Sequence, residues 1–213
     1  MPTQEEQIMK YQNLEMTLHD ATEKGILLPI EQIEILENMQ NRKVYIIDEI
    51  DQCLMDSIQM TIQDANEEDE GVAIEDRKPI RIYIDSYGGA LYPTLATLDF
   101  IRMSKTPVWT ICKGVAYSSA GLLLLAGHKR FCYKNSSFLL HSGNNGYVGK
   151  TDSVFDNIEF DKRVVEKLVK EHVVDRSKIS AKDYDKNYRR EWFMSSSEML
   201  EHGIVDEISN EII

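Results

Sequence analysis

The sequence predicts an α/β domain in which parallel strands alternate with crossover helices. Short apolar runs rich in β-branched residues alternate along the chain with segments whose apolar residues recur at helical spacing. With 213 residues, 42% of them hydrophobic, the chain can bury one good-sized core without disulfides or metals. We therefore expect one main domain at residues 41–213 and a polar, acidic, partly helical extension at residues 1–40, with the active groups at the carboxyl ends of the strands.

The first half of the chain begins with one expected helix inside the extension, at residues 29–39, where Ile30, Ile33 and Leu36 recur at helical spacing. Residues 44–47 are expected to form the first core strand. A helix is expected over residues 53–65, and the acidic stretch 66–71 is expected to end it.

The second half continues the alternation. Residues 80–84 predict a strand that is closed by two glycines, and residues 91–103 predict a helix. Strands are expected at 106–112 and again at 137–141. A long helix is expected at about 152–174, with a stripe of apolar residues that comprises Val154, Ile158, Val165, Leu168 and Val169.

The composition limits the class of protein. A formal net charge of −12 disfavours binding to nucleic acid or to anionic membranes. Cys53, Cys112 and Cys132 form no CxxC pair and no metal-ligand spacing, which favours reduced, mostly buried thiols and no bound metal. The first residues lack the pattern of a signal peptide, and no apolar run approaches the length of a membrane span. We expect a cytoplasmic protein.

A serine turn lies between an apolar strand and the run Leu122–Leu125, within the segment 114–121. A serine at this position would lie beside the free N–H groups of the first helical turn, where negative charge on a reacting oxygen is stabilised. Ser118 or Ser119 is therefore a candidate nucleophile. A short serine pair before an apolar run is, taken alone, more typical of a helix N-cap.

A histidine and a glycine pair complete the candidate site. His141 ends the apolar run that begins at Ser137, and a nucleophilic serine needs such a base. Gly88 and Gly89 follow the strand at 80–84, and adjacent glycines allow backbone N–H groups to approach a ligand closely, as an oxyanion hole requires. A lone strand-end histidine could also be structural, so the order of the parts carries the argument.

This order of motifs resembles the family of the proteolytic subunit of the ATP-dependent Clp protease, a self-compartmentalised serine peptidase. Four segments carry the resemblance: Ile82-Tyr-Ile-Asp-Ser-Tyr-Gly-Gly89, Gly114-Val-Ala-Tyr-Ser118, Phe138-Leu-Leu-His141 and the stretch from Phe193 to Asp206. The resemblance covers about residues 44–208. It implies Ser118, not Ser119, as nucleophile, His141 as base, and an oxyanion hole from the N–H groups of Gly88 or Gly89 and of Ser119.

The chain departs from the family's pattern at two positions. Tyr87 stands where the family usually has proline before the glycines. Glu191 stands where the family has the aspartate of the triad, and glutamate can also orient an imidazole. Asp183 and Asp185 are alternative third members, and Glu191 could instead be a solvated surface charge.

The resemblance also implies an architecture and partners. The expected fold is that shared by the Clp protease subunit and crotonases, with repeated β-β-α and βαβ units and a protruding handle made of a strand and the long helix. The handle would dock two heptameric rings of identical subunits into a closed chamber for unfolded polypeptides. A hexameric AAA+ unfoldase of the Clp type would use ATP, so this chain would need no cofactor of its own.

Three alternatives remain open at this stage. A crotonase-type acyl-CoA enzyme would use the same fold without a serine and histidine pair. A non-catalytic ring subunit would keep the fold with a decayed triad. A membrane-bound signal-peptide peptidase of similar fold would pair its serine with a lysine.

Overall fold

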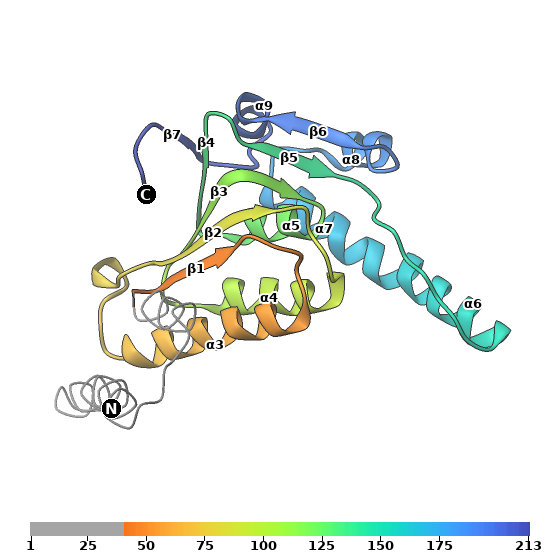
Figure 1. Cartoon of the computed structure of the whole chain (residues 1–213), viewed down its shortest axis with the longest axis horizontal. Coiled ribbons are helices and arrows are strands. Elements are labelled where there is room, and N and C mark those ends of the chain that lie inside the picture. Colours follow the sequence, from red (N-terminus) through yellow and green to blue (C-terminus); the bar gives the residue numbers. More distant parts are fainter. Residues whose placement is uncertain (1–40) are drawn as a thin grey trace, which may run out of the picture.

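The computed structural model describes residues 41–213, and the helix expected at 29–39 lies outside them. A seven-stranded sheet forms the centre of the domain (Figure 1). Its strands are β1 (Lys43–Ile46), β2 (Ile80–Ser86), β3 (Val108–Tyr117), β4 (Lys129–Tyr133), β5 (Ser137–Leu140), β6 (Trp192–Ser195) and β7 (Glu207–Ser209).

The sheet branches at its longest strand. The main path runs β1-β2-β3-β4-β7 with parallel pairing throughout. The first half of β3 pairs with β4, and its second half pairs with β5, which in turn pairs with β6 in the antiparallel sense. The carboxyl end of β3 is therefore flanked by β2 on one side and by the β5–β6 pair on the other.

The helices follow the alternation that the sequence predicts. They are α3 (Gln52–Glu68), the short 3₁₀ turn η1 (Ile74–Asp76), α4 (Leu91–Met103), α5 (Ser119–Ala126), α6 (Thr151–Phe160), the π-helical turn η2 (Asp161–Val165), α7 (Glu166–Arg176), α8 (Ala181–Asn187) and α9 (Ser196–Glu201). The fold is thus the mixed α/β fold that was predicted. No helix in residues 41–213 has the length and hydropathy to cross a bilayer.

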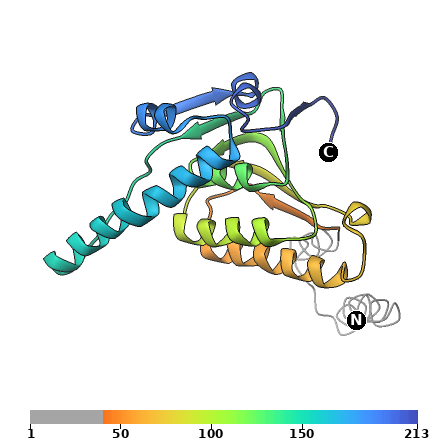
Figure 2. The same cartoon turned by 180° about the vertical axis from the view of Figure 1, so that it is seen from behind.

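The main core lies between the sheet and the helices α3, α4 and α5. Helices α3 and α4 lie side by side beneath β1 and β2 in both views (Figures 1 and 2). Ile80, Ile82 and Ile84 of β2 alternate toward this core, and all eight residues of α5 are buried. Tyr83 points to the opposite face, into a smaller cluster with Ile111 and Phe131.

Helices α6, η2 and α7 form one continuous rod that projects away from the domain (Figure 1). This rod is the long helix that the apolar stripe predicts. The expected strand of the handle is not formed: residues 141–150 are described and carry no strand. They contain three glycines, and no strand within residues 41–213 pairs with them.

The other element predictions differ from the structure mainly at their ends. The bounds of α4 are those predicted, whereas α3 continues to Glu68 through residues that were expected to break it. Strand β3 runs five residues beyond the predicted end at 112, through Gly114. The glycine does not end the strand because it lies at a register shift against β2, where the Asp85 carboxylate accepts a hydrogen bond from the N–H of Val115 at 3.0 Å.

Candidate active site

Ser118 occupies the sharp turn between β3 and α5. Its φ of 56° and ψ of −126° are a conformation that L-residues rarely adopt, and Ser118 is one of two non-glycine residues in 41–213 with positive φ. Its side chain does not cap the helix. The N-cap alternative is therefore wrong for Ser118, and a strained turn at a candidate nucleophile indicates a functional constraint.

The glycine pair lies directly against this turn. A Cβ at Gly88 would lie 2.7 Å from the carbonyl oxygen of Tyr117 and 2.8 Å from Cβ of Ser118, so only glycine permits this approach. The N–H of Gly88 donates to Ser86 Oγ at 3.1 Å. Ile50 donates its N–H to the carbonyl of Gly88 and accepts from the N–H of Ala90. The N–H of Gly89 takes part in neither of these two hydrogen bonds.

Ser119 opens α5, so its N–H has no acceptor within the helix. Its hydroxyl, in contrast, donates to the carbonyl of Gly89 at 3.3 Å. Ser119 is 3% exposed. The second serine therefore ties the helix to the glycine pair, while the side chain of Ser118 stays outside that contact.

His141 and Glu191 face each other across the β5–β6 pair. Leu140 and Trp192 are register partners in this antiparallel pair, and the next residues outward are His141 and Glu191. His141 Nδ1 lies 3.2 Å from Glu191 Oε1. The side chain of His141 is 19% exposed and that of Glu191 is 59% exposed. Glu191 thus reaches the histidine from the partly solvated rim of the site.

Ser118 and His141 line one cavity of about 310 Å³. It lies between the Ser118 turn, the start of α4, the segment after His141 and the long helix. His141 Nε2 is buried and has no hydrogen-bond partner among residues 41–213. Nε2 is the nitrogen that a general base would use. It is therefore free to accept a proton, and it belongs to a residue that lines the same cavity as the serine.

The two alternative acids are engaged elsewhere. Asp183 accepts from the Ser180 hydroxyl at 2.6 Å in the first turn of α8. Both carboxylate oxygens of Asp185 lie 2.7 Å from Lys170 Nζ. Neither carboxylate contacts His141, which leaves Glu191 as the one described acid at the histidine.

A second buried histidine has a structural role. His172 is 1% exposed, with Nε2 at 2.9 Å from the Leu122 carbonyl and Nδ1 at 2.6 Å from Arg102 Nη2. Burial lowers the pKa of His172 from 6.5 to about 4. Because the ring must accept from Arg102, it is neutral and donates to the carbonyl. Through its hydrogen bond to Leu122, His172 holds α7 against α5.

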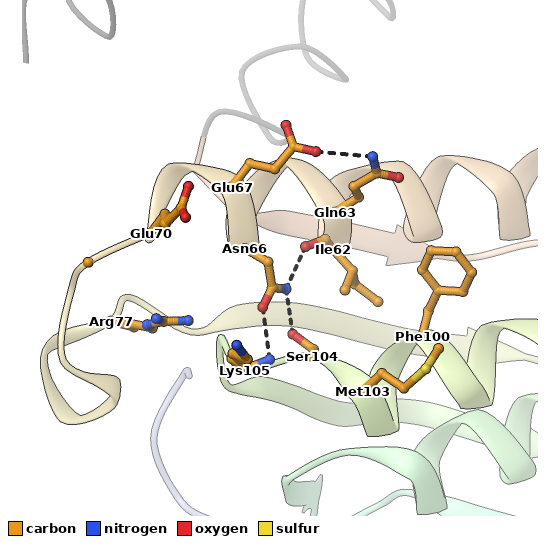
Figure 3. Close-up of a pocket in the computed structure, with 11 residues that line it drawn as sticks. Ile62, Gln63, Asn66, Glu67, Glu70, Arg77, Phe100, Met103, Ser104 and Lys105 are labelled. Atoms are coloured by element: carbon orange, nitrogen blue, oxygen red, sulfur yellow. Dashed lines mark hydrogen bonds between the residues drawn. The ribbon is translucent and has the colours of Figure 1, made fainter. Parts of the chain in front are cut away.

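A larger cavity of about 580 Å³ lies between the ends of α3 and α4 (Figure 3). Asn66 joins the two elements there: its amide nitrogen donates to Ser104 Oγ at 2.7 Å and its oxygen accepts from the N–H of Lys105 at 2.8 Å (Figure 3). Among residues 41–213, the side chains that line it include no histidine and no cysteine. This cavity therefore marks the place where α3 packs against the end of α4, and none of its described lining residues is a candidate catalytic group.

The sequence patterns did not single out Asp161, which also lines the cavity at Ser118. Asp161 is 6% exposed. The available signal was its position, because Ile158, Asp161 and Val165 recur at helical spacing and place an acid on the apolar stripe.

Together, these features define an α/β protein that carries a serine, a histidine and a carboxylate at the carboxyl edge of its sheet, the groups of a hydrolytic site. The model of the Clp protease family matches residues 30–211. Because this match covers most of the chain, the chain belongs to the Clp protease family, a family of peptidases.

The chain is similar to curated proteins named as proteolytic subunits of the ATP-dependent Clp protease. It is 34% identical to the Deinococcus radiodurans subunit over 135 residues, 61% of this chain and 64% of that one. It is 29% identical to the Bacteroides thetaiotaomicron subunit over 187 residues, 85% and 80% of the two chains. Subunit 2 of Treponema denticola is 36% identical over 137 residues, 62% of this chain and 66% of that one. The chain thus spans a little under two thirds of the first and third relatives.

Proposed function

We propose that this chain is the proteolytic subunit of an ATP-dependent Clp protease, a serine endopeptidase that hydrolyses peptide bonds of unfolded polypeptides. The observation that carries the proposal is the contact of 3.2 Å between His141 and Glu191. This contact lies beside the cavity that His141 and Ser118 both line, where Nε2 of His141 has no hydrogen-bond partner among the described residues. Family membership supplies the reaction class.

In the proposed mechanism, the carboxylate of Glu191 accepts a hydrogen bond from the N–H at Nδ1 of His141. This bond holds the proton on Nδ1, so that Nε2 carries a lone pair. Nε2 takes the proton of Ser118, and Oγ forms a bond to the substrate carbonyl carbon. The C–N bond then breaks, His141 returns the proton to the leaving amine, and water releases the acyl group by the same steps.

The N–H groups of Ser119 and of Gly88 or Gly89 would hold the oxyanion. Gly89 is favoured because the N–H of Gly88 donates to Ser86. Ser118 and His141 Nε2 are not hydrogen-bonded to each other in the free chain. Such bonds often tighten only when substrate is bound.

The serine is tested with a fluorophosphonate probe, followed by intact-mass spectrometry. We expect one adduct on the wild type, none on Ser118→Ala, and slowed labelling of Glu191→Ala. The absence of an adduct on correctly assembled wild-type particles would contradict the proposal and favour a non-catalytic ring subunit.

We further propose that two heptameric rings enclose the active sites in the cytoplasm. Helix α6 has no buried residue, and Phe155 and Phe160 on it are 64% and 43% exposed. A helix that exposes two large aromatic side chains suits a docking handle. Native mass spectrometry tests this: fourteen copies are expected, and a monomer at micromolar concentration would refute it.

A hexameric AAA+ unfoldase is the proposed partner and the user of ATP, with no cofactor bound by this chain. Five aromatic side chains lie on the side of the sheet that faces away from the helices, and we call them the aromatic face: Tyr45, Tyr83, Trp109, Phe131 and Tyr133. Tyr45 and Tyr83 stack with ring centroids 4.8 Å apart, and Tyr45 is 37% exposed. Such a surface suits apolar loops of a partner.

Tyr45→Ala should reduce degradation of an unfolded protein by the chain together with a Clp unfoldase from the same organism. Hydrolysis of a short peptide without the unfoldase should be unchanged. Equal degradation of the unfolded protein by variant and wild type would contradict docking at the aromatic face.

A further inference from the structure

Asp161 is a buried carboxylate in an otherwise exposed part of the long helix. It follows α6, in which no residue is buried, and it begins the π-helical turn η2. Its own exposure is 6%. A carboxylate at such a depth needs hydrogen-bond donors, because burial without them is costly.

Three donors from two separate segments meet this carboxylate. The Tyr92 hydroxyl donates to Oδ1 at 2.8 Å, and the side-chain amide of Asn145 donates to Oδ2 at 2.7 Å. The Tyr147 hydroxyl also donates to Oδ2. The hydrogen bond to Asp161 raises the pKa of Tyr92, and it raises that of Tyr147 to about 12. Both phenols therefore stay protonated and act as hydrogen-bond donors.

The two segments that Asp161 joins both come from the candidate active site. Tyr92 lies in the first turn of α4, three residues after Gly89. Asn145 and Tyr147 lie in the segment without regular structure that directly follows His141. In the described residues, the other side-chain contact to this segment is weak: Tyr188 donates to the Ser142 carbonyl at 3.5 Å.

We propose that Asp161 is a positioning residue for the peptidase reaction: by holding Asn145, Tyr147 and Tyr92 together, it fixes the segment after His141 against the glycine pair. The proposal rests on the proposed serine peptidase function. Asp161 does not touch the reacting atoms. It fixes the position of the His141 imidazole relative to the glycine pair on the other side of the cavity.

The test measures the second-order rate constant for fluorophosphonate labelling of Ser118 in assembled particles, together with kcat and KM for a short peptide. Asp161→Asn keeps the size of the side chain but replaces one acceptor oxygen with an amide NH₂ group, which donates and does not accept. We expect labelling and kcat to fall by roughly 10- to 100-fold, since small misplacements of reacting groups cost rates of this order. KM should change less than kcat.

Tyr147→Phe removes a single hydroxyl and should slow labelling several-fold. The double variant should be no slower than Asp161→Asn alone, because the two residues act through one contact. Asp175→Asn is the matched control: this aspartate lies on the same rod, in α7, and is exposed. Its labelling rate should stay within about twofold of the wild type.

A purely structural role predicts a different result. Asp161→Asn would then lower the melting temperature while each folded molecule was labelled at the wild-type rate, and this outcome would overturn the proposal. If Asp161→Asn does not assemble, Tyr147→Phe and Tyr92→Phe test the proposal in its place. Wild-type labelling rates in both variants would overturn the proposal. Failure of the proposed function itself is distinguishable, because the wild type would then not be labelled.

Discussion

Replacing Gly88 with alanine tests whether the close approach of the glycine pair shapes the Ser118 turn. The added Cβ would lie 2.7 Å from the Tyr117 carbonyl oxygen and 2.8 Å from Cβ of Ser118, at a φ of +102°. To reach ordinary van der Waals contact, the turn must move by about 0.7 Å. Both contacts are to groups fixed by the backbone, so no flexible side chain can absorb the change.

This displacement sets the expected magnitude. A misplacement of about 1 Å costs catalysis about 100-fold, so labelling of Ser118 should slow by roughly 10- to 100-fold in Gly88→Ala. The positive φ and the overpacking together should also lower the free energy of unfolding by about 2–4 kcal/mol. The labelling rate is measured by intact-mass spectrometry on particles whose assembly is checked by native mass spectrometry.

Gly203→Ala is the matched control. Gly203 also has a positive φ, of +67°, but its nearest neighbour would be Cγ of the Lys178 side chain at 3.0 Å. It should lose stability and keep the labelling rate. If assembled Gly88→Ala were labelled within about twofold of the wild type, the argument from the close approach would be refuted.

Three further predictions follow from contacts of the described residues. Glu191→Asp withdraws the carboxylate from Nδ1 by one methylene, so labelling should be slower than in the wild type and faster than in Glu191→Ala; equal rates in all three would contradict the role of the acid. Burial lowers the pKa of His172 to about 4, so the neutral ring stabilises the fold fully above pH 6.5. As the pH falls from 6.5 toward 4, up to about 3 kcal/mol should be lost, and urea unfolding of His172→Gln should lack this dependence. Asp69→Ala removes the acceptor of Arg42 and Thr106 and should cost about 2–3 kcal/mol in thermal or urea unfolding, less if Glu68 retains Arg42; an unchanged midpoint would refute this.

The parts of the fold that depend on local periodicity were predictable from the sequence. Helix α4 has the predicted bounds because its apolar residues recur at helical spacing. The predicted strand ends at 112, short of the observed end of β3, because the sequence places the segment that begins at Gly114 in the serine turn. The reason for a glycine at Gly114 is nonlocal, because a Cβ there would lie 2.4 Å from Asp85 Oδ1, and this carboxylate lies 30 residues before Val115, from whose N–H it accepts a hydrogen bond.

The candidate site divides in the same way. Ser118 and His141 stand at the ends of recognisable strands, so motif order located them. The choice among Glu191, Asp183 and Asp185 required the register of β5 against β6, which the spacing of residues does not contain. For Asp161, the sequence offers only an acidic residue on the apolar stripe of a helix. Its role depends on donors that lie 14, 16 and 69 residues away, which local spacing does not reveal.

The pairing of β5 with β6 has a consequence for the order in which the site is built during synthesis. Ser118, the glycine pair and His141 emerge from the ribosome first, but Glu191 directly precedes strand β6 and follows the histidine by 50 residues. Because contacts of long sequence separation form late, the histidine stays without its carboxylate until β6 has been made and has paired with β5. A growing chain that ends before β6 therefore carries an incomplete set of the proposed catalytic groups.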